Sequence, residues 1–116
     1  MPRLCASDHI SFFFTSLLGE WDKNPNRTRT AFYIGQSYEC LERFEEAYEW
    51  YERRFAIGGW FEEAYEAKYR MARCAKAMGK PWPEVQQLYL DAHSYLPARA
   101  EPLFEIAAHW YDVLCG

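Results

Sequence analysis

Histidine and aspartate side chains are the first candidates for chemistry in this chain of 116 residues. His93 and His109 lie on different predicted helices and could meet in space, and His109 shares a helix face with Asp112 three residues later. A histidine beside a carboxylate can act as a general base or bind a metal ion, but these tasks also need a nucleophile or further ligands, for which no pattern is present. We therefore expect no catalytic residue, no metal site, no cofactor and no enzymatic activity in this chain alone.

Cysteines are spread along the whole chain and form no cluster. They are Cys5, Cys40, Cys74 and Cys115. Their separations of 35, 34 and 41 residues leave no CxxC or other metal-ligand pair. Scattered thiols are typical of a reducing compartment, where cysteine acts as a small buried hydrophobic residue. We expect structural thiols and a cytoplasmic protein.

An apolar stretch near the start, Ile10–Leu18, follows Arg3 and could be mistaken for a secretory signal. Asp8 and His9 interrupt the approach to it, and no small-x-small cleavage site follows. The stretch is also too short to span a bilayer. The sequence therefore predicts neither secretion nor a membrane span.

Composition is that of a globular domain, with a net charge of −4 and half of the residues apolar. Nucleic-acid-binding proteins usually carry a basic excess, so we expect no nucleic-acid partner. Aromatic residues make up 19% of the chain, and most fall at helical spacing, where packed helices need bulky side chains. The length is that of one domain with one core.

Helical periodicity and stop signals predict about six helices and no strand. Their approximate ranges are 8–21, 28–41, 44–57, 61–78, 83–96 and 101 to the chain end. Breaks are predicted at Asn24-Pro25-Asn26, at Gly58-Gly59 and at Gly79. Pro83 suits the first position of the fifth helix.

One side-chain stripe at spacing i, i+3, i+4, i+7 occurs on three of these helices. Its members are Ala31, Ile34, Gly35 and Tyr38, then Lys68, Met71, Ala72 and Ala75, then Leu103, Ile106, Ala107 and Trp110. The centre moves 37 residues from Gly35 to Ala72 and 35 residues from Ala72 to Ala107. Small residues at these centres let a partner helix approach closely.

This period is similar to the roughly 34-residue period of tetratricopeptide helix pairs. The resemblance implies an all-α fold, a right-handed solenoid of antiparallel helix pairs in a single domain, 1–116. The pairs would be a half repeat at 8–24, full repeats at 28–58 and 61–97, and a half repeat at 99–114.

In tetratricopeptide pairs the first helices line a concave groove, and here its candidate residues include both cations and aromatic rings. They are Arg29, Phe32, Gln36, Glu39, Tyr69, Arg70, Arg73, Lys76, Phe104 and Tyr111. Arginine donates charge-assisted hydrogen bonds and rings stack, so this groove would suit an extended peptide with an acidic residue. The alternative is a solvated helix face whose charges bind nothing.

Several sequence blocks carry a second resemblance. They are RTRTAFYIGQSY at 27–38, EAYEWYERR at 46–54, GGW at 58–60, YLDA at 89–92 and PARAEPL at 97–103. Together they resemble the tetratricopeptide-like region that follows the catalytic domain in many family-two glycosyltransferases. That family uses a metal-binding Asp-x-Asp where it binds a nucleotide sugar, and no two aspartates here stand two apart. The resemblance implies an accessory module, either free-standing or part of a longer enzyme.

We therefore expect a non-catalytic interaction module that binds a protein or peptide partner. A glycosyltransferase catalytic domain is one such candidate partner. Two alternatives stay open. Stacking of Tyr69, Phe104 or Tyr111 on sugar rings would make the chain a glycan-handling part of a split or truncated transferase. Apolar faces left exposed by terminal half repeats would instead favour self-association into a homo-oligomer.

Overall fold

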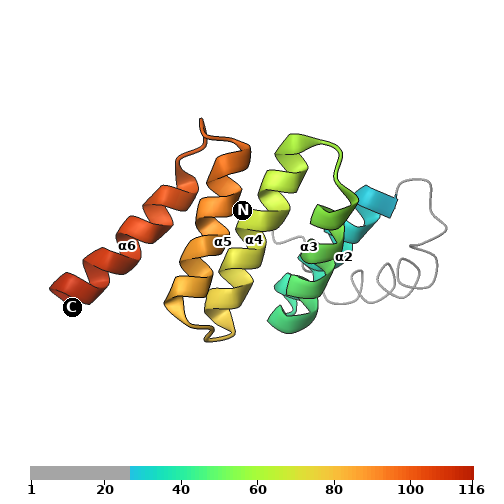
Figure 1. Cartoon of the computed structure of the whole chain (residues 1–116). Coiled ribbons are helices and arrows are strands. Elements are labelled where there is room, and N and C mark those ends of the chain that lie inside the picture. Colours follow the sequence, from blue (N-terminus) through green and yellow to red (C-terminus); the bar gives the residue numbers. More distant parts are fainter. Residues whose placement is uncertain (1–26) are drawn as a thin grey trace.

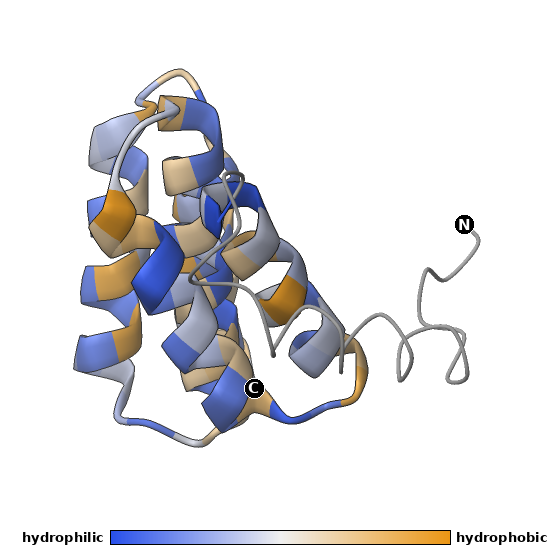
Figure 2. Ribbon diagram, turned by 90° about the vertical axis from the view of Figure 1, so that its right-hand side faces the viewer, coloured by the Kyte–Doolittle hydropathy of each residue, from blue (hydrophilic) through white to orange (hydrophobic). Residues whose placement is uncertain are grey.

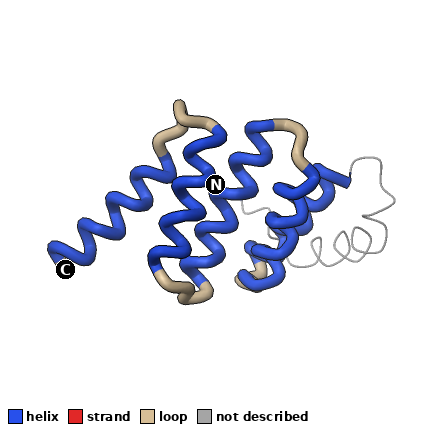
Figure 3. The backbone as a smooth tube through the Cα atoms, viewed as in Figure 1, coloured by secondary structure: helices blue, strands red, loops and turns tan. Residues whose placement is uncertain are grey.

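The structure is a computed structural model that describes residues 27–116, and its regular structure there is entirely helical (Figures 1 and 3). The helices are α2 (Arg27–Cys40), α3 (Phe44–Ile57), α4 (Phe61–Ala77), α5 (Trp82–Tyr95) and α6 (Glu101–Cys115). The all-α prediction is confirmed for these residues, and each of the five helices begins and ends within one residue of its predicted position. The helix predicted at 8–21 lies outside the described residues.

Successive helices run in opposite directions and pack on their neighbours in the sequence (Figure 1). Contacts are extensive from α2 to α3, from α3 to α4 and from α4 to α5, and sparser from α5 to α6. In Figure 1, α6 begins beside the C-terminal end of α5 and leans away from it along its length. The described helices therefore form a row whose last member is only partly covered.

The hydrophobic core runs between the helices from α2 to α5. Its buried members are Phe32, Ala47, Tyr51, Ala67, Met71, Ala72, Cys74, Ala75, Val85, Leu88 and Tyr89. A second cluster, of Ala31, Ile34 and Trp50, lies between α2 and α3. Hydrophobic and hydrophilic residues are interleaved along the helices (Figure 2).

Close approach between α2 and α3 occurs at Gly35, as the stripe predicts. A Cβ atom on Gly35 would lie 2.8 Å from two ring carbons of Tyr51, a distance that real Cβ contacts do not show. The Tyr51 ring is fully buried and lies 5.6 Å from the ring of Phe32. The absence of a side chain at Gly35 therefore sets the spacing of this helix pair.

The turn after α2 is closed by a residue in the left-handed conformation, Glu42, with φ 59°. Its N–H donates to the carbonyl of Glu39 at 2.9 Å, and the N–H of Arg43 donates to the carbonyl of Tyr38 at 2.9 Å. These two bonds form a Schellman motif, in which glycine usually occupies the left-handed position. Gly79, with φ 80°, takes that position after α4.

The loop between α3 and α4 is built around a buried arginine. Arg54 is completely buried, its Nε lies 2.5 Å from Oε1 of Glu63, and its Nη1 donates to the carbonyl of Gly58 at 2.8 Å. Gly58 and Gly59 have φ values of 78° and 94°, which confirms the predicted left-handed stop. Arg54, in the last turn of α3, therefore links this helix to Glu63 in the first turn of α4 and to the loop between them.

Candidate functional site

The candidate groove residues come from α2, α4 and α6. Glu39 of α2 connects α2 to α4 through its side chain. Its Oε1 accepts a hydrogen bond from the Tyr51 hydroxyl at 2.7 Å and lies 3.2 Å from Nη1 of Arg70. Its Oε2 lies 3.2 Å from Nη2 of Arg73, while Nε of Arg70 lies 3.1 Å from Glu66. One carboxylate therefore pairs with two arginines of α4, a role that the sequence does not reveal.

This arrangement changes the electrostatics predicted for the groove. The expected cation series of Arg70, Arg73 and Lys76 is partly neutralised from within the chain by Glu39 and Glu66. Arg70 is mostly covered, but 47% of the Arg73 side chain is exposed, and Lys76 is exposed one turn later. Arg73 and Lys76 are therefore the cations that a ligand can reach.

The other candidates on α2 are arranged differently. Phe32 is buried in the core, with the Arg70 guanidinium 5.6 Å from its ring, so it does not offer a stacking surface to a ligand. The guanidinium of Arg29 lies 6.0 Å from the centre of the Trp60 ring, and Trp60 belongs to the loop between α3 and α4. Gln36 is half-buried. The structure thus joins Glu39 to the α4 cations but does not place Phe32 on the groove surface.

Tyrosines of α4 contact carboxylates of α6. The Tyr69 hydroxyl donates to Oε1 of Glu105 at 3.2 Å, and the Tyr65 hydroxyl donates to Oε2 of Glu101 at 3.3 Å. Burial, followed by the nearby charge of Glu105, raises the pKa of Tyr69 to about 12. Both tyrosines are therefore neutral donors at neutral pH, and they hold α6 against α4. The two residues of each pair are 36 positions apart in the sequence, and no sequence pattern indicates that they contact each other.

The exposed rings of the candidate groove lie on α6. Phe104 is 69% exposed and Tyr111 is 68% exposed, whereas Tyr69 is half-buried. Two aromatic candidates therefore remain available for contact with a ligand, and both belong to the helix with the sparsest contacts to its neighbour.

Histidines do not form the pair that the sequence allows. The ring of His109 stacks on Trp82 at the start of α5, with the ring centres 3.6 Å apart and an interplanar angle of 8°. His93 lies near the opposite end of α5, so the two histidines do not meet. Gln86 completes this cluster by accepting hydrogen bonds from the indole N–H groups of Trp82 and Trp110, each at 3.0 Å.

Cysteine environments differ from one position to the next. Cys74 is buried and free, and burial, followed by the charge of Glu39, raises the pKa of its thiol to about 12. Cys115 is exposed and free. Cys40 is disulfide-bonded, which differs from the expectation of reduced thiols throughout the chain. Cys5 lies outside the described residues.

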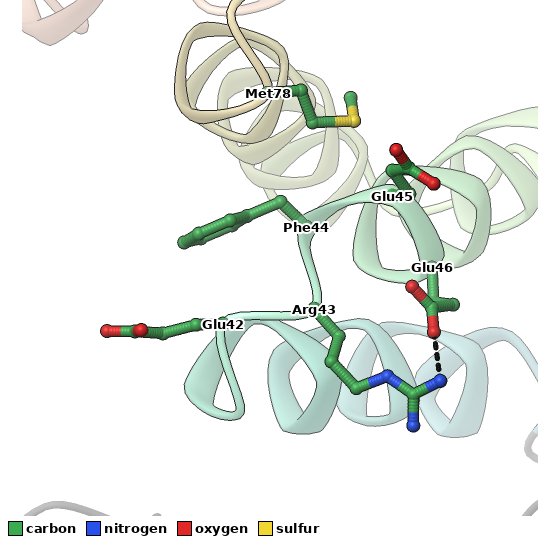
Figure 4. A pocket seen from close by; sticks show the side chains of 6 residues that line it. All are labelled: Glu42, Arg43, Phe44, Glu45, Glu46 and Met78. Carbon is green, nitrogen blue, oxygen red and sulfur yellow. Dashed lines mark ion pairs between the residues drawn. The ribbon is translucent and has the colours of Figure 1, made fainter.

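A pocket of about 280 Å³ opens beside the turn between α2 and α3 (Figure 4). It is lined by Glu42, Arg43, Phe44, Glu45, Glu46 and Met78, none of which is a candidate groove residue. Arg43 and Glu46 form an ion pair across its wall (Figure 4). Three of the lining residues are glutamates, and none is a histidine, cysteine, serine or threonine.

Within residues 27–116, no three histidine, cysteine, aspartate or glutamate side chains are grouped so that they could hold a metal ion. In the same part of the chain, no helix is both long enough and apolar enough to cross a membrane. Comparison of the chain with known proteins found no matching family model, no similar curated protein and no similar solved structure. The two family resemblances therefore stay predictions from the sequence.

Proposed function

We propose that this chain is a non-catalytic interaction module of tetratricopeptide type, which binds an extended peptide with an acidic residue along α2 and α4. Support for the repeat comes from the turns as well as from the helices. Glu42 and Gly79, which are 37 residues apart, close equivalent turns after α2 and α4. This separation equals the shift of the side-chain stripe from Gly35 to Ala72.

The observation that carries the binding proposal is the anchoring of Arg73. Its Nη2 lies 3.2 Å from Glu39, and nearly half of its side chain is exposed. A guanidinium has five N–H donors, so one ion pair leaves other donors of Arg73 for a ligand. Glu39 already limits the rotation of the Arg73 side chain. Binding of a ligand carboxylate to Arg73 therefore costs less side-chain conformational entropy.

Cations of α4 would supply the donors for an acidic ligand. Arg70 and Arg73 pair with Glu39 and Glu66, whereas Lys76 takes part in none of the ion pairs found among the described residues. The two cations that are exposed lie on the same helix, one turn apart. An extended peptide with a carboxylate would therefore meet its donors along α4.

The test is selection of binders from a displayed random peptide library, followed by affinity measurement with synthetic copies of the selected peptides. We expect enrichment of acidic peptides, and about tenfold weaker binding to the Arg73→Gln variant, because a hydrogen bond to a charged group contributes about 1.5–3 kcal/mol. Arg53→Gln is the matched control, since Arg53 is exposed on α3. Equal affinity for both variants, or selection without acidic peptides, would reject the proposal.

The sequence blocks at 27–38, 46–54 and 58–60 lead us to propose a family-two glycosyltransferase catalytic domain as the first protein partner to test. This step rests on the resemblance of those blocks and not on the geometry of the groove. Sedimentation of the purified chain mixed with such a domain, with wild-type and Arg73→Gln protein, measures the interaction. Absence of a complex at micromolar concentrations would remove this partner and leave the peptide proposal to its own test.

A further inference from the structure

Tyr51 of α3 is completely buried, but its hydroxyl reaches Glu39, which pairs with two arginines of the proposed peptide site. We infer that Tyr51 is a positioning residue of this site, which orients Arg73 through Glu39 and touches no ligand itself. The inference rests on the proposed acidic-peptide function. It adds a residue of α3, a helix that holds none of the candidate groove residues, to a site on α2 and α4.

The two carboxylate oxygens of Glu39 have different partners. Oε1 accepts a hydrogen bond from the Tyr51 hydroxyl at 2.7 Å and lies 3.2 Å from Nη1 of Arg70. Oε2 lies 3.2 Å from Nη2 of Arg73. Two donors on one oxygen, from α3 and from α4, fix the direction of the carboxylate. The other oxygen is thereby aimed at Arg73.

Tyr51 is a rigid support for this carboxylate. The centres of its ring and the Phe32 ring are 5.6 Å apart, and a Cβ atom on Gly35 would lie 2.8 Å from two of its ring carbons. A ring packed so closely on α2 holds its hydroxyl in a fixed place relative to Glu39 of the same helix. Burial, followed by the charge of Glu39, raises the pKa of Tyr51, so the hydroxyl keeps its proton and remains a donor.

Loss of the Tyr51 hydroxyl would change how Glu39 is shared between the arginines. The carboxylate could then turn and pair with the Arg70 guanidinium through both oxygens, a geometry that arginine favours. Oε2 would leave Arg73, whose side chain is 47% exposed and would sample more rotamers. Binding of a ligand carboxylate would have to order that side chain again, so Tyr51→Phe should weaken binding without changing any charge.

Arginine side-chain NMR tests the anchoring in the free protein. We expect the Nε–H group of Arg73, assigned by its absence from the spectrum of Arg73→Gln, to become more mobile in Tyr51→Phe. Tyr65→Phe is the matched control. It also removes a hydroxyl that donates to a glutamate, but this glutamate, Glu101, takes part in none of the ion pairs found among the described residues. Unchanged mobility in Tyr51→Phe, or an equal increase in Tyr65→Phe, would overturn the inference.

Binding of a synthetic acidic peptide, selected from the displayed library with the wild-type protein, tests the consequence. We expect about two- to tenfold weaker binding to Tyr51→Phe, the range that ordering one long side chain at an interface accounts for, and unchanged binding to Tyr65→Phe. In an Arg73→Gln background, Tyr51→Phe should have no further effect, because no guanidinium is left to orient. An equal loss in both backgrounds would indicate general structural damage and overturn the inference.

Glu39→Asp tests the same link without altering the buried tyrosine. It keeps the charge but draws the carboxylate back from Arg73 by one methylene group, so binding should weaken as in Tyr51→Phe. Circular dichroism checks that each variant has the helicity of the wild type. Binding that is weakened by Arg73→Gln but by neither Tyr51→Phe nor Glu39→Asp would overturn this inference and leave the acidic-peptide function standing. Equal binding to Arg73→Gln and wild type, or a library without acidic binders, would reject both.

Discussion

At the scale of single residues, the contact between Gly35 and Tyr51 controls the distance between α2 and α3. We expect Gly35→Ala to lower the free energy of unfolding by about 1–3 kcal/mol, because its Cβ would lie 2.8 Å from the Tyr51 ring. Urea unfolding followed by circular dichroism measures the change. Ser37→Ala on the same helix is the control. A loss below about 0.5 kcal/mol would show that the ring moves aside easily.

Cys74 and Cys115 should differ in their reactivity towards alkylating reagents, because one is buried and the other is exposed. Cys74 is buried with a pKa of about 12, so at pH 8 an alkylating reagent should modify exposed Cys115 and leave Cys74 intact. Mass spectrometry after alkylation of the native and the urea-unfolded protein measures this difference. Rapid native modification of Cys74 would contradict its burial.

The raised thiol pKa also has a consequence for stability. The unfolded thiol has a pKa near 9.0, so the folded state holds this proton more tightly. The contribution of Cys74 to stability is therefore complete below pH 9.0 and declines as the pH rises towards about 12. Cys74→Ala should remove this part of the alkaline decline in the unfolding midpoint.

At the scale of elements, the turn after α2 holds a glutamate where glycine is favoured. We expect Glu42→Gly to raise the free energy of unfolding by about 0.5–1 kcal/mol, because Glu42 has a φ of 59°. In the equivalent turn after α4, Gly79→Ala should lower the free energy of unfolding by a similar amount, because Gly79 also has a positive φ. Thermal unfolding of both variants measures the effects, and a stabilising Gly79→Ala would contradict the shared turn geometry.

The loop between α3 and α4 depends on the buried guanidinium of Arg54. We expect Arg54→Met to lower the free energy of unfolding by about 3–5 kcal/mol, because the mostly buried Glu63 carboxylate loses its partner. Arg54→Met combined with Glu63→Leu should recover part of this loss, since no unpaired charge then remains. If the double variant is as unstable as the sum of the single ones, the pair is not the cause.

At the scale of the whole molecule, α6 is a partial cover for the end of the helix row. Deleting residues 98–116 exposes Trp82, on which His109 stacks, and removes the packing of Ile106 on the core. We expect a loss of at least about 2 kcal/mol, because uncovering one large apolar side chain costs roughly 1.5–3 kcal/mol. Circular dichroism should show that α2 to α5 remain helical at low temperature. An unchanged unfolding midpoint would mean that α6 contributes nothing to the fold.

Local signals were enough to predict the helices and several of their ends. The 3.6-residue period places α3 from Phe44 to Ile57, and Gly58 and Gly59 end it by adopting positive φ values. Gly35 was also predictable as a point of close approach, because a small residue in an apolar stripe admits a partner helix. Helix formation depends on contacts between residues three and four apart, so one short window of sequence contains this information.

Tertiary structure alone decided the chemistry of the candidate site. Glu39 meets Arg70 across 31 positions of the sequence, and this contact partly neutralises cations that the sequence shows only as candidate groove residues. The burial of Phe32 and the stacking of His109 on Trp82 likewise depend on how neighbouring helices are rotated and offset. Periodicity gives the face on which a side chain lies, whereas its partner depends on the packing of whole helices. The sequence by itself therefore determined the elements of this protein, and their packing determined which charges and rings a ligand can reach.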